Sequence, residues 1–200
     1  MASKDRILRY KEETRVNILD AALKIVKQDG WQSLSMRKIA DEIEYTAPII
    51  YEYFLNKEAI LLELTRMGFL MLTKKLEEAR NNNLLPADQL EAMWFAYWNF
   101  AFANMEYYQV MFGLQTSCCC ETVRSMPEAE APENLFDEVI RGVLKNKNPD
   151  EEAVCTAYYT CWSVVHGLIS INIVRRGSSD EINLLVLKNA IGSIIKSMAE

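Results

Sequence analysis

The stretch TAPIIYEYF, residues 46–54, combines hydroxyl, tyrosyl and small apolar side chains with a single acid. Ile50 and Phe54 stand four residues apart, so they predict the buried side of a short helix. The opposite side then carries small, apolar and tyrosyl groups together with one acid, Glu52. Such a side is unusual for a helix that faces water. We therefore expect it to meet a partner.

The partner that these groups suit best is the major groove of DNA. Methyl groups there meet thymine methyls, and tyrosyl hydroxyls meet phosphates. We predict that the residues nearest the bases are Thr46, Ala47, Pro48 and Ile49. We predict that the sugar–phosphate backbone is contacted by Arg37, Lys38, Tyr51, Tyr53 and Lys57.

A second short helix must precede this one to hold it in place. Met36, Ile39, Ala40 and Ile43 recur with helical spacing, and Ser35 before them is a typical N-cap. The two residues Glu44 and Tyr45 leave room only for a turn. We expect a helix-turn-helix at 35–54, followed from Lys57 by a long helix whose positive end favours phosphate.

At these residues the chain resembles the tetracycline-repressor (TetR) family of regulators over roughly residues 10–62. The similarity runs through Ile18–Trp31 (ILDAALKIVKQDGW), Ser35–Ala40 (SMRKIA), Ile50–Phe54 (IYEYF, read with Tyr51 and Tyr53) and Lys57-Glu58. It implies an N-terminal DNA-binding domain, a C-terminal ligand-binding and dimerisation domain, and a homodimer that binds a palindromic operator under the control of a small-molecule effector.

Two residues depart from the family pattern. Glu44 stands in the turn where the family usually has Gly, and a left-handed conformation there would strain it by about 1 kcal/mol or more. The recognition helix lacks the Lys or Arg that the family often carries, so a bidentate contact with guanine cannot come from its centre. Glu52 is repelled by phosphate unless it accepts from a cytosine amino group.

Composition indicates an all-α protein with about nine helices. The first long helix is expected over residues 10–29 and a loop or frayed segment over 114–131. Pro132 is expected to open a helix to about Lys145, and Asn148 to cap the helix that follows. The chain has 200 residues, 50% of them hydrophobic, with only 7 Gly and 5 Pro, and no alternating pattern that would favour strands. We predict a DNA-binding domain over 1–56 and a helical effector-binding and dimerisation domain over 57–200. No signal peptide and no apolar run of about 18 residues is recognised, and the cysteines fit a reducing compartment, so a cytoplasmic, nucleoid-associated protein is expected.

The charge is unevenly distributed along the chain. The net charge is −6, yet residues 1–60 are neutral, with ten basic and ten acidic residues. The first turns are rich in cations (Lys4, Arg6, Arg9, Lys11 and Arg15). They are either a solvated helix start or an arm that lies along the phosphate backbone.

Aromatic residues are concentrated in the second domain. A packed core explains any one of them, but their number favours a cavity with aromatic walls and a largely apolar ligand. Trp162-Ser-Val-Val-His166-Gly167 also resembles the WHG signature of one C-terminal subgroup of the family, and His166 is either a core residue or a ligand contact. The predicted ligand-binding residues are Trp94, Tyr97, Trp98, Phe102, Tyr108, Phe112, Tyr158, Trp162 and His166.

The last two helices predicted, over 151–198, are apolar around most of their circumference. Two such antiparallel helices favour a four-helix bundle between two copies. The predicted dimer contacts are Leu168, Leu187, Ile191, Ile194 and Ile195. Cys118-Cys119-Cys120 is either a sensor of metal or redox state or a run of incidental thiols.

These features favour a dimeric, ligand-responsive transcriptional repressor. The chain is not expected to be an enzyme, since it has a single histidine, no phosphate-binding glycine loop and no metal-ligand spacing. No cofactor and no metal is expected, and no membrane partner. The alternative is a helical ligand carrier or adaptor without specific DNA binding, which Glu44 and Glu52 would favour.

Overall fold

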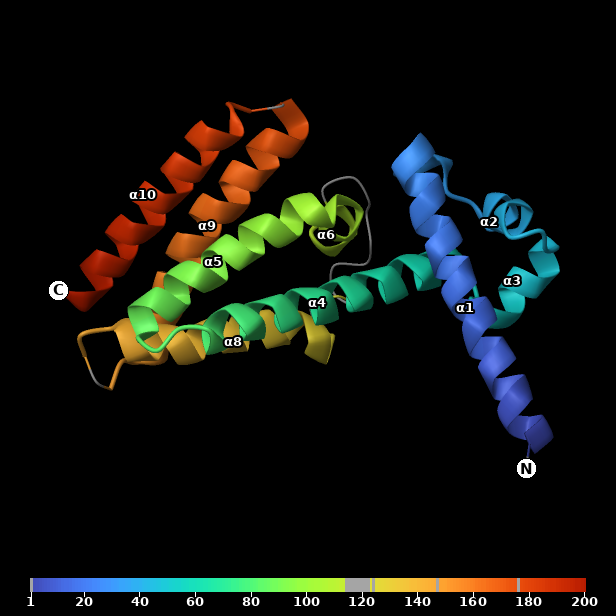
Figure 1. Cartoon of the computed structure of the whole chain (residues 1–200), viewed down its shortest axis with the longest axis horizontal. Helices are drawn as coiled ribbons and strands as arrows, with labels where there is room; N and C mark the ends of the chain where they lie inside the picture. The colour runs from blue at the N-terminus through green and yellow to red at the C-terminus, as the bar shows by residue number, and fades with distance from the viewer. Residues whose placement is uncertain (1, 114–122, 124, 147, 176) are drawn as a thin grey trace. The chain divides into compact units, whose positions relative to one another are not determined.

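The computed structural model describes residues 2–113, 123, 125–146, 148–175 and 177–200. These residues form nine α-helices and one 3-10 helix and no strand, which confirms the all-α prediction (Figure 1). They divide into two compact units. The first comprises residues 1–67 and 106–123, and the second comprises 68–105 and 124–200. The cysteine run at 118–120 lies outside the described residues.

The first unit is built from short helices around one long one. Its elements are α1 (Ala2–Asp29), the 3-10 helix η1 (Trp31–Ser33), α2 (Met36–Glu42), α3 (Ala47–Tyr53), the first turns of α4 (Lys57–Asn81) and most of α6 (Met105–Met111). Ile18, Ile39, Ile50 and Leu64 come from four different helices and are all fully buried in one core. This shared core fixes the position of α3.

Helix α1 begins earlier than the sequence suggests. The expected first helix covers residues 10–29, whereas α1 starts at Ala2. The expectation followed the apolar stripe, which begins near Ile18. The turns before it have no such stripe, and residues 4–13 are all exposed. They are helical because they extend α1, whose later turns are packed in the core.

The second unit is a bundle of long helices: the rest of α4, α5 (Pro86–Ala103), α8 (Pro127–Val143), α9 (Glu151–Arg175) and α10 (Asp180–Ala199). Helix α5 packs against α8, α9 and α10, and α9 packs against α8 and α10. Arg80 on α4 forms an ion pair with Glu138 on α8 at 2.7 Å. Trp94 and Phe136 are the largest side chains of the unit that are completely buried in the core between these helices.

The helix boundaries around two prolines differ from expectation. A loop was expected up to residue 131, with Pro132 opening the next helix, but α8 starts at Pro127 and Pro132 lies buried inside it. Pro127 already occupies the first turn, where a missing N–H is tolerated. For α9, Asp150 rather than Asn148 is the cap, because the Ala153 N–H donates to Asp150 Oδ1 at 2.8 Å.

Helices α9 and α10 are apolar but only partly covered. Their most apolar 18-residue windows reach a mean hydropathy of 1.2, enough by length and composition to cross a membrane, although no uninterrupted apolar run of that length is present. Core helices of soluble proteins meet the same criterion, so this is a weak indication. Only 33% of the window in α9 and 22% of that in α10 is buried. Both helices therefore leave apolar surface exposed.

Candidate functional site

Helix α2 is capped as its sequence predicts. The hydroxyl of Ser35 accepts a hydrogen bond from the Lys38 N–H at 3.2 Å, and Met36, Ile39 and Ala40 are buried. Outside this buried side, the Lys38 ammonium pairs with Asp29 of α1 at 3.0 Å. The ion pair joins α2 to α1, and α3 packs on α2 in turn.

The turn between α2 and α3 is a Schellman motif with an unusual residue at its left-handed position. Tyr45 N–H donates to Ala40 O at 2.9 Å, and Glu44 N–H donates to Asp41 O at 3.3 Å. Glu44 has φ 59°, the one positive φ at a non-glycine residue among those described. The predicted strain at Glu44 is therefore present, and the turn keeps its geometry in spite of it.

Helix α3 presents the predicted side outward. Ile50 and Phe54 are buried at 0% and 5% exposure, whereas Tyr51 is 54% exposed. Thr46 and Pro48 are exposed, while Ala47, Ile49 and Tyr53 are partly buried. Thr46 is the N-cap residue, but its side chain makes no capping hydrogen bond. Its hydroxyl is therefore available to a partner.

The predicted backbone-contacting cations differ in how they are held. Arg37 is exposed. Lys57, at the start of α4, donates from Nζ to the Trp31 carbonyl at 3.2 Å, and Asn56 caps the same helix by accepting from Ala59 N–H at 2.9 Å. Lys57 is thus oriented by the 3-10 turn, and binding a phosphate would require it to share or exchange this bond.

One contact of this unit escaped the sequence reasoning. The Trp31 indole N–H donates to Gln109 Oε1 at 3.0 Å, with Gln109 on α6 only 8% exposed. Val110 belongs to the same buried core as α1 and α4. The Gln109 amide side chain lies in a segment of mostly aromatic and apolar residues. This pattern is the sequence signal that could have suggested a polar partner for Trp31. Helix α6, which follows directly on α5, is therefore part of the DNA-binding unit's core.

In the second unit, five of the predicted ligand-binding residues come together. Trp94 stacks on Phe136 with ring centroids 4.0 Å apart and lies 6.0 Å from Tyr158. The Trp162 indole N–H donates to the Tyr97 hydroxyl at 3.1 Å. His166 stacks on Trp162 at 4.7 Å. We call the connected group of Trp94, Tyr97, Phe136, Tyr158, Trp162 and His166 the aromatic cluster.

The remaining predicted ligand residues form two separate pairs. Trp98 and Phe102 lie on α5 with ring centroids 4.7 Å apart. Tyr108 and Phe112 have the same separation but belong to the first unit, where Tyr108 is completely buried. Phe136 was not predicted, because it is the single aromatic residue of α8 and the prediction relied on segments rich in aromatic residues.

Burial dominates the protonation behaviour of the aromatic cluster. Desolvation raises the pKa of Tyr158, and nearby Tyr97 and Glu133 raise it further. Burial lowers the pKa of His166, which favours a neutral imidazole. Burial also raises the pKa of the Cys161 thiol to about 12. The cluster therefore offers neutral hydrogen-bonding groups and apolar rings.

Two carboxyl groups of α8 border the aromatic cluster. Desolvation, then Asp137 and Glu130, raises the pKa of Glu133. Desolvation also raises the pKa of Asp137, against the effect of Arg141, and its Oδ1 is buried without a hydrogen-bond partner. These acids would disfavour an anionic group placed beside them.

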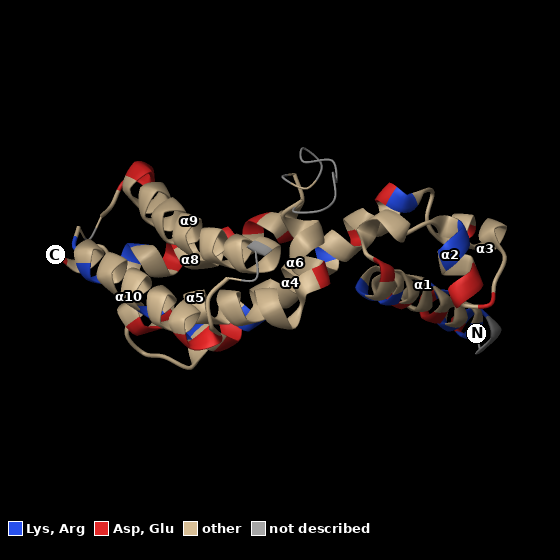
Figure 2. Ribbon diagram, turned by 90° about the horizontal axis from the view of Figure 1, so that it is seen from above, with Lys and Arg blue, Asp and Glu red and all other residues tan. Residues whose placement is uncertain are grey.

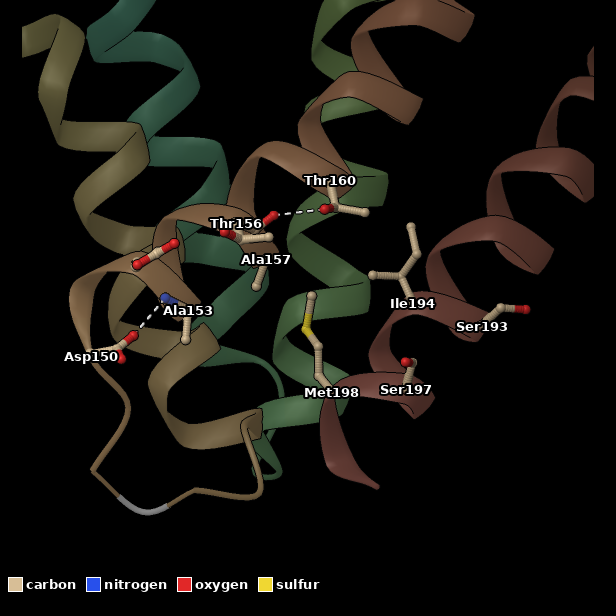
Figure 3. A pocket seen from close by; sticks show the side chains of 10 residues that line it. Asp150, Ala153, Thr156, Ala157, Thr160, Ser193, Ile194, Ser197 and Met198 are labelled. Carbon is tan, nitrogen blue, oxygen red and sulfur yellow. Dashed lines mark hydrogen bonds between the residues drawn. The ribbon is translucent and has the colours of Figure 1, made fainter.

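The predicted dimer residues fall into two groups. Leu187, Ile191 and Ile195 are buried inside the protomer, whereas Leu168 and Ile194 keep part of their surface exposed. Ile194 lines an open groove of about 640 Å³ between α9 and α10 (Figure 3). The groove is bordered by small and hydroxylated residues: Ala153, Thr156, Ala157, Thr160, Ser193 and Ser197.

The fold and the exposed α3 define a helix-turn-helix DNA-binding regulator, and the comparisons agree. Residues 18–64 match the family model described as "Bacterial regulatory proteins, tetR family", and residues 90–180 match "Tetracyclin repressor-like, C-terminal domain". Together the two matches span well over half of the chain, and the chain belongs to the TetR family. Regulators of this family are soluble cytoplasmic DNA-binding proteins rather than enzymes.

Individual relatives are more distant. The chain is 30% identical over 94 residues to an uncharacterized HTH-type transcriptional regulator of Haemophilus influenzae, covering 47% of this chain and 50% of the relative. It is 30% identical over 71 residues to the fatty acid metabolism regulator protein of Bacillus subtilis, covering 36% and 37%. The matches thus span half or less of these relatives' lengths.

A solved structure resembles almost the whole chain. The fatty acid degradation regulator of Bacillus halodurans superposes with a TM-score of 0.73 at 18% identity, covering 90% of this chain and 94% of that one. At 18% identity the similarity shows a shared fold and nothing about function. It shows that both units occur together in one known architecture.

Proposed function

We propose that the chain is a homodimeric transcriptional repressor that binds a palindromic operator on the nucleoid and is released by a small apolar effector. The observation that carries this proposal is the outward side of α3. Thr46, Pro48 and Tyr51 are exposed there, while Ile50 and Phe54 anchor the helix in the core. A short helix held so firmly, with apolar and hydroxyl groups outward, suits the major groove.

The roles proposed for the site residues follow their place on this surface. Thr46, Ala47, Pro48 and Ile49 lie at the start of α3 and would read base edges. The residues proposed to contact the backbone are Arg37, Lys38, Tyr51, Tyr53 and Lys57. Lys38 would have to release Asp29 to do so, so we expect it to contribute least.

In vitro selection from random duplexes tests sequence-specific binding. A repressor should enrich one inverted repeat, with half-sites about one helical turn apart, roughly 34–36 Å. Lys57→Ala should then weaken all duplexes alike and lower the salt slope by roughly one, whereas Ile49→Ala should change the preference at one or two base pairs. Failure to enrich any sequence would favour the carrier or adaptor function.

Dimerisation is proposed through the exposed faces of α9 and α10. Ile171, Val174, Ile182, Leu185 and Val186 are between 44% and 72% exposed near the connection of the two helices. So much clustered apolar surface is typical of a protein–protein interface. A second copy that packs α9 and α10 against these would complete a four-helix bundle.

The effector is proposed to bind at the aromatic cluster. The cluster offers apolar rings together with neutral hydroxyl, indole and imidazole groups. Two of the similar proteins are named for fatty acids, so an acyl compound is the first class to test. Because Glu133 and Asp137 border the cluster, we expect an uncharged ester or amide of a long-chain acid to bind better than the free carboxylate.

If the effector weakens operator binding, operator DNA must weaken effector binding in turn. To weaken operator binding a hundredfold, the effector must favour the non-binding state by about 2.7 kcal/mol, and operator DNA must weaken effector binding by the same factor. Tryptophan fluorescence can measure effector affinity with and without the selected operator, since Trp94 and Trp162 lie in the cluster. Equal affinities would contradict ligand control even if the effector bound.

A further inference from the structure

The first turns of α1 form a helical overhang, which we define as residues 4–13. Every one of these residues is exposed, and the buried part of α1 begins at Thr14. Figure 1 shows these turns continuing past α3 towards the N-terminus. Isolated helices shorter than about 12–15 residues are marginal in water. The overhang is held helical by the rest of α1, and a contact outside α1 also ties it to the unit.

That contact is a hydrogen bond between two tyrosyl hydroxyls. The Tyr10 and Tyr45 hydroxyls are 2.8 Å apart, although the residues are 35 positions apart in sequence. Tyr45 is the last residue of the turn and directly precedes Thr46, the N-cap of α3. This bond is the largest cause that raises the pKa of Tyr10, so the Tyr10 hydroxyl stays protonated at neutral pH. The overhang is thus tied to the start of the recognition helix.

Of the overhang's cations, Arg6 lies on the side of this bond, and Arg9, Lys11 and Lys4 lie on the flanking sides. Arg6 is one turn before Tyr10 on the same side of the helix, and Lys4 and Lys11, seven residues apart, share a neighbouring side. Asp5 and Glu12, also seven apart, share the side opposite Tyr10. Glu13 lies close enough to Tyr10 to raise its pKa and is the exception.

Most of the first unit's Lys and Arg side chains that have no ion pair or hydrogen bond to a described residue lie in the overhang. Arg15, Lys24 and Lys38 pair with Glu63, Glu42 and Asp29, respectively. Arg66 pairs with Glu63 as well, and Lys57 binds a carbonyl. Lys4, Arg6, Arg9 and Lys11 make no hydrogen bond or ion pair with any residue that the structure describes.

Helix α3 itself has no Lys or Arg (Figure 2). Phosphate attraction is a large part of DNA affinity and is supplied by such cations. With α3 lacking them and carrying the acid Glu52, the attraction must come from elsewhere on the unit. The exposed, unpaired cations next to the start of α3 are those of the overhang and Arg37.

We propose that the overhang is a second DNA-contacting element. Its Lys and Arg side chains bind phosphates that flank the base pairs under α3, and the Tyr10–Tyr45 bond sets the register between the two elements. Arg6 lies about 6 Å along the helix axis beyond Tyr10. An arginine at that distance reaches backbone next to the segment that α3 contacts.

The salt dependence of binding to a random-sequence duplex tests this proposal. Each phosphate contact contributes about 0.9 to the slope of log affinity against log salt concentration. The double variant Arg6→Ala/Arg9→Ala should lower the slope by roughly 1.8 per bound protomer. Alanine favours the helix, so circular dichroism should show helicity retained. Because this probe needs no operator, the result does not depend on the repressor function.

Lys27→Ala is the matched control, because Lys27 is an exposed cation at the other end of the same helix. It should leave the slope unchanged. If Arg6→Ala/Arg9→Ala changes the slope no more than Lys27→Ala does, the overhang does not contact DNA.

The tyrosine bond is tested by a double-mutant cycle on duplex affinity. Tyr10→Phe and Tyr45→Phe each remove one hydroxyl and should weaken binding about three- to tenfold, the effect of one net hydrogen bond. The double variant should be no weaker than either single variant. Full additivity, or no effect of either variant, would overturn the assigned role of the bond. Tyr51→Phe serves as the independent reference and should add to Tyr10→Phe.

Discussion

The two units of this protein differ in how completely they satisfy their own side chains. The DNA-binding unit caps α2 and α4, pairs Arg15, Lys24 and Lys38 with acids, and gives the buried Trp31 a partner in Gln109. All three buried side-chain atoms without a hydrogen-bond partner, among the described residues, lie in the second unit: Trp94 Nε1, Asp137 Oδ1 and Ser170 Oγ. The second unit also exposes the apolar faces of α9 and α10.

This difference reflects what each unit must do. A DNA-binding unit needs a single geometry, because its side chains must lie within a fraction of an ångström of the positions from which they contact base edges. Its polar groups are therefore fixed by internal partners. An effector and dimerisation unit has to accept other molecules, and unsatisfied or exposed groups leave room for them.

The strongest test compares two charges on α10. Ile191 is fully buried, so Ile191→Glu places a carboxylate in the protomer core and should destabilise it by at least about 3 kcal/mol. Leu185 is 58% exposed, so Leu185→Glu should leave the protomer folded but separate the dimer. Sedimentation and thermal melting distinguish the two outcomes. A folded dimer for Leu185→Glu would place the interface elsewhere.

A second test removes the internal partner of Trp31. Gln109→Leu leaves the indole N–H buried and unpaired, which should cost about 1–3 kcal/mol of unfolding free energy. The matched control is Gln89→Leu, whose amide donates only to the Asn83 carbonyl in the second unit at 3.0 Å. Chemical denaturation measures both. Equal small effects would mean that the DNA-binding unit does not depend on α6.

The strained turn provides a third test, in the stabilising direction. Glu44→Gly relieves a left-handed conformation that costs a side chain about 1 kcal/mol, although glycine's greater freedom in the unfolded chain offsets part of this gain. We expect a rise of up to about 1 kcal/mol in unfolding free energy. Glu44→Ala should give no such gain, since alanine keeps the strain. If both variants stabilise equally, charge rather than backbone conformation is responsible.

The smallest effect concerns pH. Burial lowers the pKa of His166 in the folded state, so below about pH 6.5 the unfolded chain binds a proton that the folded chain resists. Stability should therefore fall as pH drops from about 7 through 6, with a slope of at most about 1.4 kcal/mol per pH unit. His166→Gln should remove this slope. An unchanged slope in the variant would assign it to other groups.

Much of the DNA-binding unit could be predicted from its sequence because its signals are local. The Ser35 cap, the apolar spacing of Ile39 and Ala40, and the turn at Glu44 each depend on residues within one or two helical turns. The structure confirms the cap and the left-handed residue in the turn. The family matches then confirm the fold class and the regulator function that the same residues indicated.

Tertiary structure alone decided which partners distant residues find. Hydrophobic spacing shows that Leu187 and Ile191 are apolar but not whether their own protomer or a second copy covers them, and the structure buries both within the protomer. The Tyr10–Tyr45 and Trp31–Gln109 bonds join residues 35 and 78 positions apart. No local pattern encodes such pairs, because they depend on how whole helices pack.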